Sequence, residues 1–133
     1  MAQRLLKLAV IYLMIGMTLG LFMGMTQHLE YYSVHAHINL LGWASLGLAA
    51  LVFRLFPDLA ATRLAMAYFW IYNIALPIGL VGLTFKVMGY KWAEPILGVG
   101  MTFVWVAGCL FGINVLLNLS AAREQISAEP IRA

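Results

Sequence analysis

Four long apolar segments constrain this chain more than any other feature of its sequence. They cover roughly Leu5–Thr26, Val34–Phe56, Leu64–Met88 and Trp92–Leu119. A helix needs ~20 consecutive apolar residues to cross the hydrocarbon core of a bilayer, and each segment is that long. The linkers that join them are short, so successive helices must run antiparallel. Those linkers are Gln27–Ser33, Pro57–Arg63 and Gly89–Lys91. The sequence therefore predicts an all-α, up-down bundle of four transmembrane helices.

The composition agrees with a lipid environment and argues against other classes of protein. Of the 133 residues, 64% are hydrophobic and only 10% are charged, whereas a soluble domain carries about 25% charged residues. The basic residues are scattered at segment ends, so the net charge of +3 does not indicate nucleic acid as a partner. The single cysteine, Cys109, matches no metal-site spacing. We expect residues 1–120 to form one transmembrane domain and residues 121–133 a polar cytoplasmic tail.

The basic residues also predict the orientation of the helices. Only Lys86 and Lys91 fall at one end of the expected bundle, against six at the other end. The six are Arg4, Lys7, Arg54, Arg63, Arg123 and Arg132. Cytoplasmic ends of membrane proteins are enriched in Lys and Arg, so both termini are expected in the cytoplasm. The first segment is longer than the apolar core of a signal peptide, and no cleavage site follows it, so we expect it to be retained.

Small and polar residues interrupt the apolar segments at regular positions. Gly16, Gly20 and Gly24 are four residues apart, a spacing that lets another helix approach closely. Gly108 and Gly112 repeat it in the last segment. We expect both stripes to pack within the bundle or between subunits, and a cofactor lying against the glycines is the alternative.

Three asparagines lie at membrane depth and are expected to face protein, where they can hydrogen-bond between helices. They are Asn39, Asn73 and Asn114.

The only histidines, His28, His35 and His37, all fall toward the expected outer face. Helical residues two apart point about 200° away from each other, so a helix that includes both His35 and His37 prevents them from sharing one metal ion. If the helix starts later, both can reach one ion. On a helix, His37 shares its face with Leu41, Ala44 and Leu48. His35 shares its face with Asn39, Gly42, Leu46 and Phe53.

Imidazole binds iron, copper and zinc well. In an apolar slot between helices haem suits it best, because the macrocycle is buried and one ring nitrogen takes the iron. His37 and His35 are the candidate metal ligands, and His28 and Asn39 are further candidates for contact with the cofactor. A histidine that simply hydrogen-bonds a carbonyl at the membrane interface is the alternative.

Met14, Met17, Met25 and His28 fall within about 80° of one another on the first helix. Thioether and imidazole together suit Cu(I). Methionine is also an ordinary filler of packed interiors. We expect these methionines to pack in the core, with copper handling as the alternative.

The run from His35 to Trp43, HAHINLLGW, resembles the second helix of haem-copper oxidase subunit I, especially the nitric-oxide-reductase and cbb3-type branches. There a His-x-Asn motif supplies an axial ligand to the low-spin haem, and here that motif is His37-Ile38-Asn39. The Phe69-Trp70 pair is a further likeness. Over residues 5–119 the chain is similar to short four-helix bacterial proteins classed as cytochrome oxidase subunit I-like. The resemblance implies a bacterial inner-membrane protein that binds haem b through His37.

The chain also departs from that family. Subunit I carries further histidines on later helices for a second haem and a copper, but no histidine follows His37 here. A single chain therefore lacks the oxygen- or nitric-oxide-reducing centre, and we expect electron transfer, haem sensing or haem carriage. The alternatives are a cofactor-free partner or assembly subunit and a copper-handling protein.

Assembly into a homo-oligomer is expected on two grounds. Subunit I arranges its helices as three four-helix arcs, so three copies of this chain would imitate it. A six-coordinate haem needs two axial ligands, which a neighbouring subunit, His28 or a methionine of the same chain could complete. A homotrimer is favoured over a dimer paired through its glycine stripes.

The predicted orientation can be tested with fusions. A reporter that is active only outside the cytoplasm should be silent when fused after Ala133 and active when inserted after Lys91. The reverse pattern would place the histidines at the cytoplasmic face.

Overall fold

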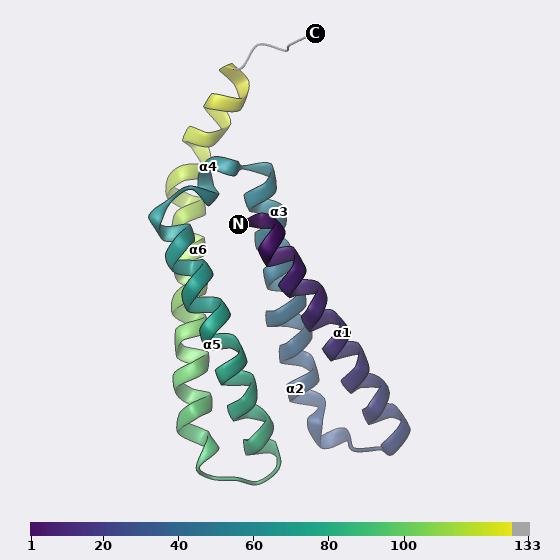
Figure 1. Ribbon diagram of the computed structural model, residues 1–133. Coiled ribbons are helices and arrows are strands. Elements are labelled where there is room, and N and C mark those ends of the chain that lie inside the picture. The colour runs from purple at the N-terminus through teal and green to yellow at the C-terminus, as the bar shows by residue number, and fades with distance from the viewer. Residues whose placement is uncertain (129–133) are drawn as a thin grey trace.

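The computed structural model describes residues 1–128, with side chains to residue 119. All regular structure in this part of the chain is helical (Figure 1). The first long helix, α1, is followed by a second segment built from η1, α2, the π-helix η2 and α3. Two further long helices, α5 and α6, come after the short helix α4. Their bounds are α1 Ala2–Thr26, η1 Leu29–Tyr31, α2 Tyr32–His37, η2 Ile38–Ser45, α3 Leu46–Leu55, α4 Pro57–Ala60, α5 Arg63–Val87 and α6 Ala93–Ala128.

These helices confirm the predicted all-α bundle of four membrane spans. Four helical segments, Ala2–Thr26, Leu29–Leu55, Arg63–Val87 and Ala93–Leu119, are long and apolar enough to cross a bilayer. The protein is a multi-pass membrane protein. Two details differ from expectation. The linker Pro57–Arg63 contains α4, with Pro57 at the first helical position, where its missing N–H is not needed. Helix α6 continues to Ala128 into the expected tail, whose residues 129–133 lie outside the described part.

The turns between helices follow from their residues. Helix α1 ends at Thr26, and the next residue, Gln27, takes the left-handed conformation with φ 60°. The Thr62 hydroxyl caps α5 by accepting a hydrogen bond from the backbone N–H of Ala65 at 3.0 Å. Gly89 has φ 92° in the turn before α6, a value that glycine adopts without steric cost. The turns are tight, so α1 and α5 start at the same end of the bundle (Figure 1).

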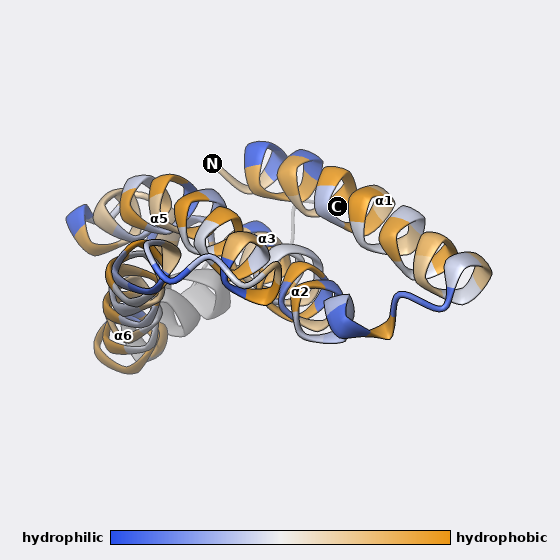
Figure 2. Cartoon of the chain, turned by 90° about the horizontal axis from the view of Figure 1, so that it is seen from below, coloured by the Kyte–Doolittle hydropathy of each residue, from blue (hydrophilic) through white to orange (hydrophobic). Residues whose placement is uncertain are grey.

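The helices pair as two hairpins, one formed by α1 with η2 and α3 and the other by α5 with α6 (Figure 2). An aromatic cluster joins them, in which Phe53 of α3 lies 6.1 Å from Tyr68 of α5 and 5.6 Å from Phe111 of α6, between ring centroids. Fully buried Asn114 adds a second link, because it donates to the Leu59 carbonyl at 2.9 Å and accepts from the Thr62 hydroxyl at 2.9 Å. Asn114 is therefore bonded between elements, as expected.

Asn73 behaves differently. It donates to the Phe69 carbonyl of its own helix at 2.6 Å, so the expected hydrogen bond between helices is wrong for this residue.

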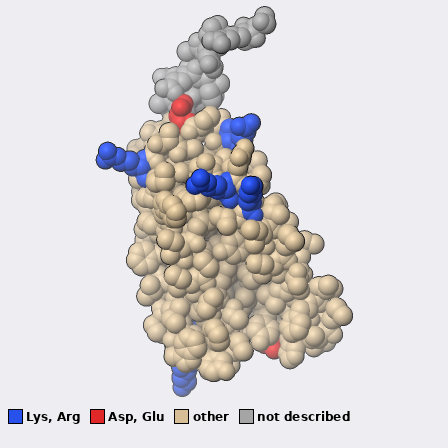
Figure 3. Space-filling view, in the orientation of Figure 1, with Lys and Arg blue, Asp and Glu red and all other residues tan. Residues whose placement is uncertain are grey.

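The outer surface of the bundle is apolar, and the charged residues visible in Figure 3 lie near its two ends. Helix α1 exposes Met14, Met17 and Met25 by 64%, 64% and 77%. The expectation that these methionines pack in the core is therefore wrong: their stripe faces outward, where lipid can cover it. Met23 is the buried methionine of α1.

Helices α5 and α6 cross at glycines that the sequence pattern did not single out. A Cβ on Gly100 would lie 2.5 Å from the backbone nitrogen of Gly79. A Cβ on Gly82 would lie 2.5 Å from the backbone nitrogen of Leu97. The expected stripe Gly108/Gly112 instead meets open space within this chain. The close crossing requires glycine because any side chain there would strike the backbone of the facing helix.

A matched pair of glycines on α6 tests this crossing. Gly100→Ala should lower the free energy of unfolding by ~1–3 kcal/mol, because the added methyl forces the backbones apart. Gly98→Ala should be neutral or stabilising by up to ~1 kcal/mol, because a Cβ there meets nothing within 4 Å and alanine favours helix. Thermal unfolding in detergent, followed by circular dichroism, measures both. Equal effects would contradict the assigned crossing.

Candidate functional site

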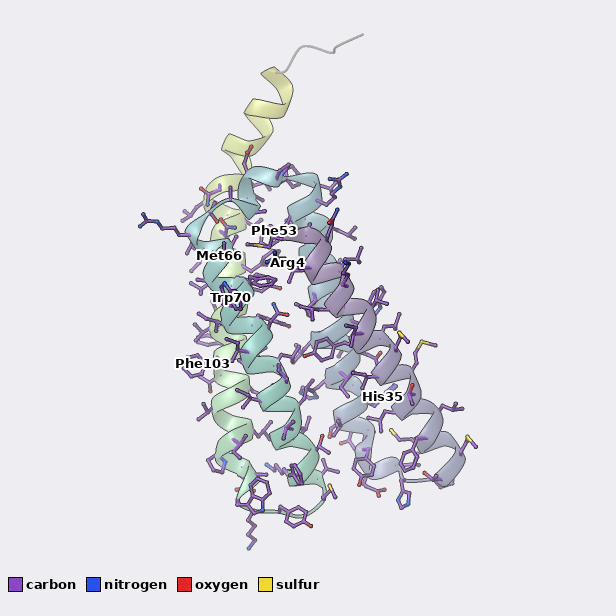
Figure 4. The ribbon with its side chains drawn as sticks, in the orientation of Figure 1. Arg4, His35, Phe53, Met66, Trp70 and Phe103 are labelled. Carbon is purple, nitrogen blue, oxygen red and sulfur yellow. The ribbon has the colours of Figure 1, made fainter. Side chains whose placement is uncertain are left out.

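The glycine stripe of α1 receives two polar side chains from the second membrane segment. His35 lies between α2 and α1 (Figure 4), where its Nδ1 donates to the Gly16 carbonyl at 2.9 Å. A Cβ on Gly20 would lie 2.7 Å from His35 Cε1, and one on Gly16 would lie 2.5 Å from Asn39 Nδ2. Gly16 and Gly20 therefore pack within the chain, as expected, while a Cβ on Gly24 would meet nothing within 4 Å.

This packing sets the direction of His37. Since α2 is helical through both histidines, His37 turns away from α1 and lines a cleft toward α5 and α6. Its Nδ1 donates to the Ser33 carbonyl at 2.7 Å. A carbonyl only accepts, so the neutral ring carries its proton on Nδ1 and its lone pair on Nε2. Nε2 has no hydrogen-bond partner among the described residues.

The cleft between the second membrane segment and the α5–α6 hairpin has a volume of ≈ 710 Å³, within the ~300–1,000 Å³ common for ligand sites. Its near wall consists of His37, Leu41, Ser45 and Leu48. Tyr68 and Tyr72 of α5 form its floor, and the far wall consists of Met101, Val104, Trp105, Gly108, Cys109 and Phe111 of α6. Leu48 and Trp105 are 63% and 69% exposed, so the cleft opens sideways, toward the lipid.

The floor of the cleft carries two phenol groups in different states. Tyr72 donates to the Leu41 carbonyl at 3.1 Å. Tyr68 is only 2% exposed, yet its hydroxyl has no partner among the described residues. That part of the chain holds no sealed, unpaired side-chain oxygen or nitrogen, so the Tyr68 hydroxyl opens into the cleft. Hydrocarbon cannot pair with it, so the cleft suits water or a ligand with polar atoms better than lipid tails.

The π-helix begins directly after His37 and changes which residues share its face. Ideal α-helical spacing predicted Ala44 beside His37, but Ser45 lines the cleft instead, with its hydroxyl bonded to the Leu40 carbonyl at 2.8 Å. Phe53 was expected on the face of His35 and instead packs toward α5 and α6. The i→i+5 bonding of a π-helix widens each turn, which places Ser45 rather than Ala44 on the cleft, although Leu48 lines the cleft as predicted. Such segments often occur at functional sites.

The other predicted site residues lie away from the cleft. His28 is exposed, donates from Nδ1 to Glu30 at 2.7 Å and stacks on Phe22 with ring centroids 5.9 Å apart. Asn39 donates to the His35 carbonyl at 2.9 Å. The structure therefore brings one of the three histidines into the cleft, and His35 and His37 do not face a common metal position. Among the described side chains, no cluster of three or more His, Cys, Asp and Glu could hold a metal ion.

Sequence reasoning missed the far wall of the cleft. Met101, Trp105 and Gly108 are spaced four and three residues apart, so they share one face of α6. That spacing was a visible signal, but it resembles the spacing of any lipid-facing stripe. Comparison of the chain with protein-family models, curated proteins and solved structures finds no match.

A second pair of glycines tests how α1 orients His37. Gly20→Ala should lower the free energy of unfolding by ~1–3 kcal/mol, because the methyl pushes the His35 ring off its hydrogen bond with Gly16. Gly24→Ala serves as the control, since its Cβ meets open space. Chemical denaturation in detergent measures both. A Gly20→Ala variant as stable as Gly24→Ala would rule out the packing of His35 as the contact that orients α2.

Proposed function

We propose that this protein binds haem b in the cleft, with His37 as an axial ligand. One observation carries the proposal: the Nδ1 of His37 is held by the Ser33 carbonyl at 2.7 Å, and the ring lines an apolar cleft of ≈ 710 Å³. Histidines that bind metals almost always donate their other ring N–H to a carbonyl, carboxylate or water. That bond fixes the tautomer and aims the lone pair of Nε2 away from the helix.

The walls of the cleft fit a flat, largely apolar macrocycle. Leu41, Leu48, Phe111 and Trp105 supply apolar and aromatic surface, and none of the lining residues carries a carboxylate that would repel the haem propionates. Lys86 and Lys91 stand at the same end of the bundle as His37, where they can attract propionates at the membrane surface. Covalent attachment is not expected, because one cysteine cannot form a Cys-x-x-Cys-His motif.

A haem in this position would supply reversible one-electron exchange. The protein's own part is to hold the iron through His37, to exclude bulk water with the aromatic walls, and to bury the macrocycle at membrane depth. The absence of further histidines after His37 favours electron transfer, haem sensing or haem carriage over reduction of oxygen in a single chain.

The likeness of HAHINLLGW to haem-copper oxidase subunit I is part of this proposal. The position of His37 on the cleft supports it. Asn39 does not lie beside the proposed cofactor, because it packs against Gly16 of α1. The homotrimer in the inner membrane of a bacterium also stays a prediction. Gly112, outside the cleft, has nothing within 4 Å of a Cβ and leaves part of α6 free for close contact with another helix.

Removal of the ligand tests the proposal. The purified wild-type protein should show a Soret band and sharp α bands after dithionite reduction. His37→Ala should abolish or convert this spectrum and weaken haem binding by more than the ~10–100-fold that loss of a supporting hydrogen bond costs.

His28→Ala is the matched control, since His28 is exposed and outside the cleft, and its spectrum should equal that of the wild type. Wild-type protein that takes up no haem, or a His37→Ala variant with an unchanged spectrum and spin state, would refute the assignment. Metal analysis of the same sample tests copper.

A further inference from the structure

The far wall of the cleft holds a residue that can complete the coordination of the iron. We propose that the thioether of Met101 is the second axial ligand, so that one chain supplies a His–Met pair. This inference rests on the proposed function. It replaces the need for a ligand from a neighbouring subunit.

The first argument is depth within the bundle. The second membrane segment and α6 both start at the end of the bundle opposite the N-terminus (Figure 1). With a rise of 1.5 Å per residue, His37 lies ~8 Å from the start of α2 and Met101 lies ~12 Å from the start of α6. The two side chains line opposite walls of one cleft at depths that differ by less than one helical turn.

The second argument is that other possible ligands in the cleft lie too far along it. The start of α6 and the end of α5 lie at the same end of the bundle. Cys109 is ~24 Å from the start of α6, and Tyr68 is ~28 Å from the end of α5. Tyr72 lies ~22 Å from that end and already donates to the Leu41 carbonyl. A macrocycle centred on the iron at His37 has Met101 as the nearest soft ligand across the cleft.

The third argument is the chemistry and freedom of the side chain. Met101 is partly buried against the glycine crossing, with its Sδ 3.3 Å and its Cε 3.1 Å from the position of a Cβ on Gly79. Three rotatable bonds let the sulfur turn from this position into the cleft. A thioether is neutral, so it binds iron without the cost of burying the charge of a thiolate or phenolate in the membrane. A His–Met pair also raises the reduction potential of haem.

Spectroscopy of haem-loaded variants tests the proposal. Wild-type ferric protein should be low-spin and should show the far-red charge-transfer band from methionine sulfur to iron. Met101→Leu should keep the haem through His37 but become high-spin and lose that band. Met101→His should stay low-spin, lose the band and have a lower reduction potential. Met66→Leu is the control, since Met66 is 52% exposed on α5 and does not line the cleft.

The outcomes separate this inference from the proposed function. A Met101→Leu variant that keeps both the low-spin state and the far-red band overturns Met101 as a ligand while His37 stands. A high-spin wild type overturns it too. If Met101→Leu loses haem altogether, Met101→His decides the question. Low-spin haem in Met101→His supports residue 101 as the position of the second ligand, and a Met101→His variant without low-spin haem overturns it. Wild-type protein without any haem refutes the proposed function itself.

Discussion

The hydrogen bond from His35 to the Gly16 carbonyl decides which way the second membrane segment faces. It depends on Gly20, whose missing side chain leaves room for the imidazole ring of His35. Once His35 is fixed against α1, helical geometry turns His37 to the opposite side, toward α5 and α6. The contact of His35 with α1, on the opposite side of the same helix, therefore places Nε2 of His37 in the cleft. His35 is a candidate metal ligand in the sequence, but in the structure its role is to orient His37, the histidine that faces the cleft.

Polar side chains inside the bilayer differ in whether they have a hydrogen-bond partner within the chain. This difference distinguishes structural residues from candidates for function. Thr18, Thr84 and Thr102 each donate to the carbonyl four residues earlier in their own helix, at 2.8, 2.8 and 2.7 Å. Asn114 is saturated by the turn that it holds. These groups need nothing from outside the chain. Within the cleft, His37 Nε2 and the Tyr68 hydroxyl have no partner among the described residues. Polarity at membrane depth is thus informative only after each hydrogen bond has been assigned.

The sequence predicted the spans, their order and the opposite faces of His35 and His37, because apolar length and helical period act locally along the chain. The cleft was harder to predict because it depends on how two hairpins lean on each other. The glycines that bring α5 and α6 together, Gly79, Gly82 and Gly100, follow no single four-residue spacing. The π-helix after His37 has no sequence signature that we recognised, and it replaces Ala44 by Ser45 on the face of the cleft. Met101 was missed for another reason, because its spacing with Trp105 and Gly108 resembles that of any lipid-facing stripe.

The sideways opening of the cleft has a consequence for how a cofactor is exchanged. Leu48 and Trp105 lie at its rim on the bilayer side, so an apolar ligand can enter from the hydrocarbon without passing through either aqueous phase. Such a ligand reaches the cleft by lateral diffusion in the plane of the membrane. Its rate of binding then depends on its concentration in the lipid rather than in water. The composition of the surrounding membrane, more than the bulk solution, then sets how quickly the cleft fills and empties.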